Sequence, residues 1–336
     1  MPESLLLQAF KGTNKTVPVW FMRQAGRYLP EYRALKAKYS LEQMFGTPEL
    51  AAQITCLPTD ILGVDAAILF ADILTLPSAM GAKITFTNDN GPQIKSSKNL
   101  SELHDFDDLS SIVKTIKLVN KQLPGHIPLI GFTGGPFTVL TYLIEGGGAL
   151  NFTKTFKFAY SEPQRFHQLL DLLTNNTIAY LKLQKDAGIK VFQIFDTWAG
   201  ILTPKDYQEW VLPYLQRIFK KIDLPSIYFL RNSAHLISLT SQCGSDFLSV
   251  DHTIPIGDVL LIQKTKQGIQ GNLFNGLLYS EDVVLKQEVS NLLKAAQTHQ
   301  RFIFNLNHGV FPDVSVEKLK LIVKTVHQFQ WKNQKI

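Results

Sequence analysis

Eight short and almost continuously apolar runs recur along this chain of 336 residues, and helical patterns fill the segments between them. Strands that alternate apolar and polar residues have one face in water, whereas strands without that alternation are covered on both faces. The runs therefore predict parallel strands separated by helices. They are Val17–Met22, Ala66–Phe70, Ile127–Phe132, Val191–Phe195, Ser226–Leu230, Phe247–Val250, Gly268–Gly271 and Phe302–Leu306.

Helix-start signals stand between these runs. Each combines a capping side chain with a proline or an acidic residue, which are the residues that the first turn of a helix favours. The clearest are Thr47-Pro48-Glu49, Ser161-Glu162-Pro163, Thr203-Pro204, Ser280-Glu281-Asp282 and Ser315-Val316-Glu317. We expect the second of these helices to end at Gly188 and the third to bend near Pro213.

Eight strands that alternate with helices predict an α/β fold, a (β/α)8 TIM barrel that forms a single domain over residues 1–336. An open doubly wound sheet is the competing α/β architecture. No strand is followed by G-x-G-x-x-G, the dinucleotide-binding signature of such sheets, so we prefer the barrel.

Charge and composition argue against several classes of protein. The chain has 45% hydrophobic and 18% charged residues, as expected for a globular core rather than a disordered chain. Its net charge is +6 without any run of five like charges, which argues against a nucleic-acid-binding tail and favours an acidic ligand. Residues 122–144 contain no Asp, Glu, Lys or Arg, but prolines and Gly134-Gly135 interrupt them, so we expect no membrane-spanning helix.

Cysteine use and the N-terminal residues bear on the compartment. Cys56 and Cys243 lie far apart and outside any C-x-x-C pattern. They provide neither a disulfide framework nor a thiolate zinc site, which suits a reducing compartment. The first residues, MPESLLLQAF, lack the basic region of a secretory signal. We therefore expect a cytoplasmic protein.

Catalytic residues of such barrels stand where the strands end. The first predicted strand is followed by Arg23-Gln24-Ala25-Gly26-Arg27, with two guanidinium groups four residues apart. If this loop winds one helical turn, both groups share a face and can bind carboxylates or phosphates bidentately. Surface ion pairs with Glu31 explain the same residues, and the two interpretations are equally open.

Asp72 follows the second predicted strand inside the apolar stretch AAILFADILTLP. A buried carboxylate needs a hydrogen-bond donor or a cation beside it. The residue is therefore either the cap of the following turn or a negative charge at the floor of a pocket. The sequence by itself slightly favours the cap.

Three further residues are candidates for the same end of the barrel. Tyr142 follows glycines that allow a ligand to approach the backbone, while Thr197 and His308 follow the fourth and eighth predicted strands. Each also has an ordinary explanation, namely a core tyrosine, a strand end and a packed or capping histidine. His252 lies beside Asp251, but no H-x-H or H-E-x-x-H pattern accompanies it, so we predict no metal site.

The segment PVWFMRQAGRYLPEYR, residues 18–33, closely resembles the N-terminal signature of the uroporphyrinogen decarboxylase family. Further blocks that resemble the family follow in its order, namely DAAILFADIL, GFTGGPFTVLTYLIEGGG, FDTWAG, IQGNL and FNLNHGV. They extend from about residue 16 to residue 315, so the resemblance covers nearly the whole chain.

The resemblance implies a cofactor-free (β/α)8 barrel that acts as a homodimer in the cytoplasm, in haem biosynthesis. The implied reaction removes carbon dioxide from the four acetate side chains of uroporphyrinogen III and gives coproporphyrinogen III. By the same resemblance, the loop from Arg23 to Arg27 binds substrate carboxylates, and Asp72 is the catalytic residue that faces the pyrrole N–H groups. Tyr142, Thr197 and His308 complete the implied pocket.

The chain departs from the family's usual pattern at several positions, most of them in the second half of the barrel. The departures are Ala71 for serine, Phe137 for tryptophan, Asn232-Ser233-Ala234 for a glycine run, His252 for tryptophan, Phe274-Asn275 for Asp-Pro, and Asn307 for glycine. We expect them to alter pocket shape and isomer preference. Two other functions stay open: a corrinoid-linked methyltransferase, which needs a His/Cys zinc cluster, and a non-catalytic porphyrinogen-binding protein.

Overall fold

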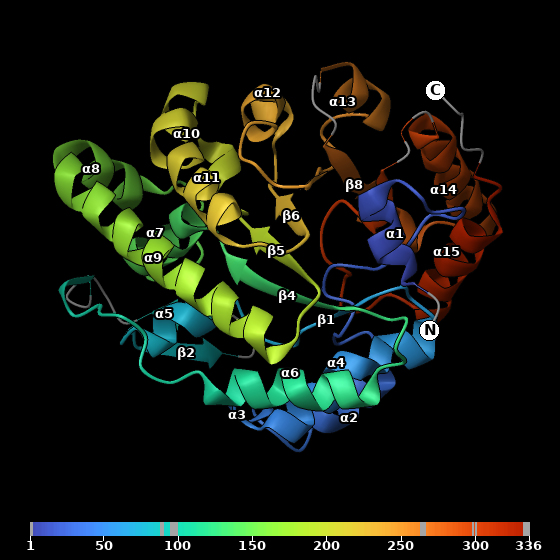
Figure 1. Ribbon diagram of the computed structural model, residues 1–336, viewed down its shortest axis with the longest axis horizontal. Helices are drawn as coiled ribbons and strands as arrows, with labels where there is room; N and C mark the ends of the chain where they lie inside the picture. The colour runs from blue at the N-terminus through green and yellow to red at the C-terminus, as the bar shows by residue number, and fades with distance from the viewer. Residues whose placement is uncertain are drawn as a thin grey trace.

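The computed structural model describes residues 3–87, 91–94, 100–262, 267–297, 299 and 301–331. Its centre is a curved sheet of seven parallel strands with helices around it (Figure 1). The strand order is β1-β4-β5-β6-β7-β8-β9, so consecutive strands of the sheet are neighbours. The strands are β1 (Ala67–Ile68), β4 (Leu129–Gly134), β5 (Val191–Phe195), β6 (Ser226–Phe229), β7 (Phe247–Ser249), β8 (Gly268–Leu273) and β9 (Phe302–Leu306).

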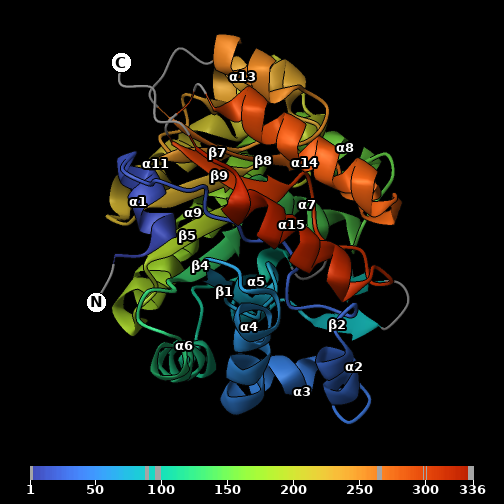
Figure 2. The same cartoon turned by 90° about the vertical axis from the view of Figure 1, so that its right-hand side faces the viewer.

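Helices cover the outside of the sheet. α4 packs against β1, α6 and α9 pack against β4, and α14 packs against β8. α14 and α15 lie side by side, and α15 also contacts α4 (Figure 2). The helices are α1 (Leu5–Lys11), α2 (Pro30–Lys36), α3 (Leu41–Gly46), α4 (Pro48–Leu62), α5 (Thr75–Ala79), α6 (Ser110–Gln122), α7 (Pro136–Glu145), α8 (Thr153–Ser161), α9 (Pro163–Ala187), α10 (Pro204–Trp210), α11 (Leu212–Lys221), α12 (Ile237–Thr240), α13 (Ile256–Ile262), α14 (Asp282–Ala296) and α15 (Val316–Gln328).

The helix signals in the sequence are confirmed. α4 and α9 begin at their prolines, and α15 begins next to its predicted cap, Ser315. α14 begins at Asp282, within the predicted start, but its N-cap is Glu281 rather than Ser280. Gly188 ends α9 with a left-handed φ of 118°, which glycine adopts without steric cost. The bend expected near Pro213 is a break at Val211, where α10 ends and α11 begins.

The first predicted strand, Val17–Met22, is wrong as a strand, although the segment lies where a first strand belongs. Only Val19 forms a parallel bridge, to Phe304 of β9, and the carbonyl of Val19 accepts the N–H of Asp65 at 2.8 Å. Side chains take the other donors: Asp65 Oδ2 accepts the N–H of Val19 at 2.8 Å, and Asn305 Oδ1 accepts that of Met22 at 3.1 Å. These side-chain hydrogen bonds take the place of a regular strand ladder where the Val17–Met22 segment closes the barrel beside β9. We call this place the seam of the barrel.

The second predicted strand is also shorter than expected, because Ala66–Phe70 contributes only the two residues of β1. The hydroxyl of Thr55 in α4 accepts the N–H of Phe70 at 3.0 Å, so this donor is turned away from the sheet. The other six strands lie where the apolar runs predict them, with ends shifted by at most two residues. The fold is a TIM-barrel-like α/β fold, which confirms the predicted class.

An antiparallel hairpin that the sequence did not predict stands outside the barrel. Its strands are β2 (Ile84–Thr87) and β3 (Gly91–Ile94). The N–H of Ile94 donates to the carbonyl of Gly146 at 3.0 Å, which ties the hairpin to the end of α7.

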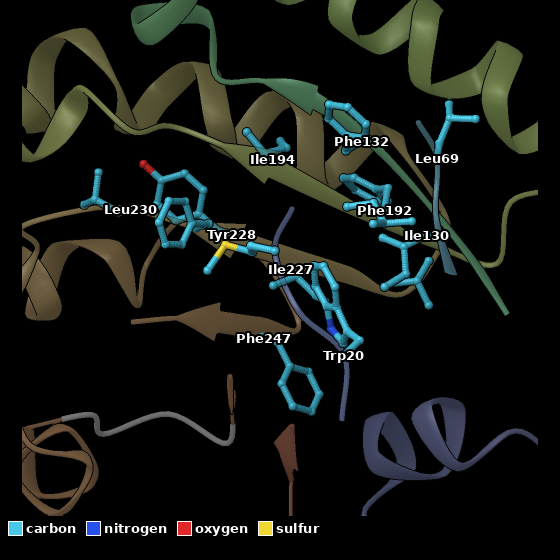
Figure 3. Packing of buried hydrophobic residues seen from close by; sticks show 14 of the residues in the cluster. Trp20, Leu69, Ile130, Phe132, Phe192, Ile194, Ile227, Tyr228, Leu230 and Phe247 are labelled. Carbon is cyan, nitrogen blue, oxygen red and sulfur yellow. The ribbon is translucent and has the colours of Figure 1, made fainter. Parts of the chain in front are cut away.

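Apolar side chains from the strands fill the core (Figure 3). Trp20, Phe192, Ile227 and Phe247 are fully buried, and each such side chain contributes about 1.5–3 kcal/mol through the area it removes from water. The buried indole N–H of Trp20 donates to Gln270 Oε1 at 2.9 Å. This packed core therefore fixes the positions of the strand ends.

Candidate active site

A cavity of about 420 Å³ opens at the carboxyl ends of the strands, within the size range of small-molecule sites. Five phenylalanines and several aliphatic side chains form most of its wall. Its polar or charged lining residues are Arg23, Tyr32, Asp72, Tyr142, Thr197, Trp198, Arg231 and His308, and its phenylalanines include Phe70, Phe132, Phe195 and Phe229. Six of the residues predicted from the sequence therefore line one cavity: Arg23, Ala25, Asp72, Tyr142, Thr197 and His308.

Asp72 combines the two roles that the sequence left open. Its Oδ1 accepts the N–H of Leu74 at 2.8 Å, and its own N–H donates to the hydroxyl of Thr75 at 3.2 Å. This turn leads into α5 and leaves Oδ2 without a hydrogen-bond partner among the described residues. Burial raises the pKa of Asp72, while the Leu74 N–H and the Arg23 guanidinium oppose the rise. The cavity thus contains a carboxylate with one oxygen available to a ligand.

Arg23 has a left-handed φ of 61°, so the chain turns sharply at this residue, and Arg23 lines the cavity. A Cβ atom on Gly309 would lie 2.3 Å from Cδ of Arg23, so the arginine side chain passes directly over this glycine. The N–H of Val310 donates to the carbonyl of Met22 at 3.0 Å and holds the two segments together. The glycine after His308 therefore makes room for the guanidinium.

The other members of the arginine loop have different positions. Gln24 is fully buried, and its amide bonds to the N–H of Phe21 and the carbonyl of Ala66, so it anchors the loop. Gly26 is close to the chain, because a Cβ there would lie 3.0 Å from the carbonyl oxygen of Arg23. Neither residue lines the cavity.

Arg27 is exposed and lines a separate hollow with Arg33 and Lys36. The expectation that Arg23 and Arg27 share a face is therefore wrong for this structure. The reason is local, because the left-handed turn at Arg23 prevents the loop from winding as a helix. A substrate-binding role for Arg27 stays a prediction.

A buried carboxylate supports the wall that carries Tyr142 and Thr197. Asp196, at the end of β5, accepts the hydroxyl and the N–H of Thr138 in the first turn of α7, at 2.6 and 3.2 Å. Tyr228 donates to its other oxygen at 3.0 Å, and burial raises the pKa of Asp196 to about 6. α7 also carries Tyr142, whose ring centre lies 5.8 Å from that of Trp198. Asp196 thus joins the end of β5 to the start of α7 behind this wall.

Arg23, Arg231 and His308 form the cationic wall of the cavity. Burial and the neighbouring guanidinium groups of Arg23 and Arg231 lower the pKa of His308 to about 4. The imidazole is therefore neutral at pH 7, where it can form hydrogen bonds but is not an acid of imidazolium type. The two arginines supply charge that does not titrate.

Sequence reasoning missed Arg231 and the aromatic lining. Arg231 follows the fifth predicted strand, and Phe132, Phe195 and Phe229 lie at strand ends, so position at a strand end was the available signal. Tyr32 and Pro92 come from α2 and the hairpin, and no pattern in the sequence connects them with the site.

The Asp251-His252 pair has a structural role. Asp251 is buried and accepts the N–H groups of Asn232 and Thr253, which joins the loops after β6 and β7. Within the described ranges, no group of three or more His, Cys, Asp or Glu side chains could hold a metal ion. In the same ranges, every helix is too short or too polar to cross a membrane.

Comparisons with known proteins agree with this geometry. The family model described as uroporphyrinogen decarboxylase matches residues 1–329. The curated uroporphyrinogen decarboxylase of Thermodesulfovibrio yellowstonii is 44% identical over 334 residues, which cover 97% of this chain and 98% of that protein. The uroporphyrinogen decarboxylase of Carboxydothermus hydrogenoformans is 36% identical and covers 98% of this chain and 97% of its own length.

A solved structure supports the fold alone. The "methyltransferase from Methanosarcina mazei" superposes with a TM-score of 0.84 at 21% identity, over 97% of this chain and 98% of that one. The family match and the curated relatives carry the assignment. The chain belongs to the uroporphyrinogen decarboxylase family.

Proposed function

We propose that this protein removes carbon dioxide from the four acetate side chains of uroporphyrinogen III and produces coproporphyrinogen III. The observation that carries the proposal is the lining of one cavity: a carboxylate, Asp72, and two guanidinium groups, those of Arg23 and Arg231, stand among aromatic side chains. A tetrapyrrole with eight carboxylates needs cationic groups at its rim and an acceptor for the N–H groups at its centre. We further infer that residues 1–336 act as one barrel domain.

The chemistry follows from the pyrrole itself. A proton adds to the pyrrole carbon next to the ring carbon that bears the acetate, and the pyrrole becomes a cation. The bond between the methylene carbon and the carboxylate then breaks, carbon dioxide leaves, and the bonding electrons form a double bond between the methylene carbon and the ring, which neutralises the cation. The methylene carbon takes a proton and the protonated ring carbon releases one, so each acetate and one net proton become a methyl group and carbon dioxide. The ring serves as electron sink, so the proposal needs no cofactor.

Asp72 has the role of stabilising the cation. Its free oxygen is available to pyrrole N–H groups, and its burial disfavours the carboxylate charge in the empty cavity. A positive charge that develops beside this anion offsets the cost of burying the carboxylate charge. The interaction is therefore stronger in the transition state than in the ground state. His308 is neutral at pH 7, which favours a water molecule held by a guanidinium group as the proton source.

We also propose a cytoplasmic homodimer. The family resemblance implies both properties. Exposed apolar side chains on the segment after β8 and on α14 support a protein interface; they are Phe274, Tyr279, Val283 and Val284.

Incubation of the purified protein with uroporphyrinogen III under reducing, oxygen-free conditions tests the proposal. We expect release of four equivalents of carbon dioxide and formation of coproporphyrinogen III without added metal. Tight binding without release of carbon dioxide would instead support a non-catalytic binding protein. Zinc-dependent transfer of a methyl group to a thiol would support the methyltransferase.

A further inference from the structure

A chain of side-chain hydrogen bonds joins the ends of β7, β8 and β9 beside the cavity. The N–H of Asn275 donates to Asn307 Oδ1 at 2.7 Å, and Asn307 Nδ2 lies 2.9 Å from Nδ1 of His252. The amide of Asn275 in turn donates to the carbonyl oxygen of Gly309 at 3.0 Å. Both asparagines are buried, whereas His252 is exposed.

The backbone N–H of Asn275 determines the direction of both hydrogen bonds that the Asn307 side chain makes. The N–H of Asn275 can only donate, so the group of Asn307 that faces it is the amide oxygen. The NH2 group of Asn307 therefore faces His252, and Nδ1 of the imidazole must accept. The neutral ring then carries its proton on Nε2.

The chain of bonds ends on the turn that contacts Arg23. Asn275 holds the carbonyl of Gly309, and the Arg23 side chain passes over the α-carbon of the same glycine. The preceding residue, His308, lines the cavity itself. A shift of this turn would therefore move the guanidinium group and the imidazole together.

We propose that Asn275 and Asn307 are positioning residues for substrate carboxylates: they fix the His308–Gly309 turn, and the turn holds Arg23 in the cavity. The inference rests on the proposed function, because it concerns affinity for the carboxylates of that substrate. Asn275 and Asn307 are two of the positions at which the chain departs from the family's usual pattern. Because they bond to each other, these departures form one unit.

Alanine variants test the effect on affinity. Asn275→Ala and Asn307→Ala should each raise KM for uroporphyrinogen III about fivefold, the value of one hydrogen bond, with kcat within about threefold of wild type. Asn176→Ala is the matched control, because it removes an equally buried and hydrogen-bonded asparagine that does not line the cavity. This control should lose stability and keep its KM. An equal rise of KM in the control, or no rise in either test variant, would overturn the proposal.

A double-mutant cycle tests the route through Arg23. If the turn acts through the guanidinium group, Asn275→Ala should raise KM by less than about twofold in an Arg23→Ala background. A further rise of about fivefold in that background would show that the two residues act independently, which contradicts the proposal.

The tautomer of His252 gives a readout that does not depend on turnover. In protein labelled with ¹⁵N-histidine, the neutral ring should show an unprotonated Nδ1 and a protonated Nε2, and Asn307→Ala should restore a mixture of tautomers. A proton on Nδ1 in the wild-type protein would overturn the chain of bonds even if the enzyme is active. The expected tautomer in a protein without turnover would support the chain and contradict the proposed function alone.

Discussion

The two turns that present Asp72 and His308 to the cavity are held in different ways. Every hydrogen bond that shapes the Asp72 turn joins residues at most three positions apart, namely Asp72 with Leu74 and with Thr75. The His308–Gly309 turn depends on Asn275, which lies 34 positions from Gly309 in the sequence. One turn is local, and the other exists only after β8 and β9 have come together.

The Asp72 turn and the cationic wall around His308 also differ in the kind of charge that they present. Asp72 is a titratable carboxylate whose burial disfavours its charged form. The cationic wall carries the charge of Arg23 and Arg231, which together with burial keeps His308 neutral. The group that we propose to stabilise charge during the reaction thus stands in a local turn. The groups that we propose to bind carboxylates stand where the strands must first come together.

Replacement of Asp72 by asparagine should have the largest effect. The amide of the new side chain keeps an oxygen for the Leu74 N–H, so the turn survives, but the negative charge is lost. We expect kcat to fall about 10²–10³-fold with KM within about threefold, measured by release of carbon dioxide. Asp108→Asn is a matched control, because Asp108 accepts the N–H of Ser110 in the same kind of turn on the surface. Equal losses of kcat and affinity in Asp72→Asn would contradict a charge-stabilising role.

The contrast between the turns also explains what the sequence could predict. The sequence offered a cap and a pocket residue as alternatives for Asp72, and the cap could be predicted because its contacts lie within a few residues of it. β5 and β9 have the predicted bounds, since their apolar runs and neighbouring helix signals are local as well. The first strand failed, because the side chains of Asp65 and Asn305 take its donors from far along the chain.

The candidate site divides in the same way. Arg23 and His308 were found at strand ends, but the spacing of Arg23 and Arg27 predicted a shared face that the left-handed turn removes. The hydrogen bonds of Asn275 and Asn307 join the loops after β8 and β9, and no pattern in the sequence pairs these two side chains. Long-range side-chain bonds were therefore the part that the sequence could not show.

Gly309→Ala should displace Arg23 from the His308–Gly309 turn and leave the Asp72 turn intact. Gly309 lacks a left-handed φ, so alanine suits its backbone, but the new Cβ would displace the Arg23 side chain. We expect KM to rise about tenfold, or about 1.4 kcal/mol, with a smaller change of kcat. Gly257→Ala, on α13, is the control because a Cβ there meets no atom within 4 Å. A fall of kcat alone in Gly309→Ala would mean that the turn serves the Asp72 side.

The pH dependence of kcat/KM distinguishes the titration of Asp72 from the behaviour of His308, which is neutral at pH 7. Burial raises the pKa of Asp72, so kcat/KM should fall on the acid side at a pH above the ordinary aspartate value of about 3.9. The pKa of His308 is about 4, so His308→Gln should leave the shape of the profile between pH 6 and 8 unchanged within about twofold. An inflection near pH 6.5 that disappears in His308→Gln would show that the wild-type imidazole is not held neutral.

The smallest expected effect concerns His327 at the seam of the barrel, where a protonated histidine stabilises the fold. His327 on α15 lies 2.9 Å from Asp65 Oδ2, the atom that also accepts the N–H of Val19. The hydrogen bond to Asp65 raises the pKa of His327. The folded state therefore favours the imidazolium, and the stabilisation is complete below the unfolded value of about 6.5 and is lost as pH rises through the folded value.

Urea unfolding of His327→Gln at several pH values measures this contribution. The side chain is 36% exposed, so screening should keep the loss below about 1 kcal/mol near pH 6, and the loss should shrink toward pH 9 and in high salt. His126→Gln is the control, since His126 is exposed and has no partner among the described residues. A loss that stays constant with pH would assign His327 a packing role. A loss that follows the predicted sign would show that this fold uses histidine charge to close its seam, while the cationic wall of its cavity takes its charge from arginines and suppresses that of His308.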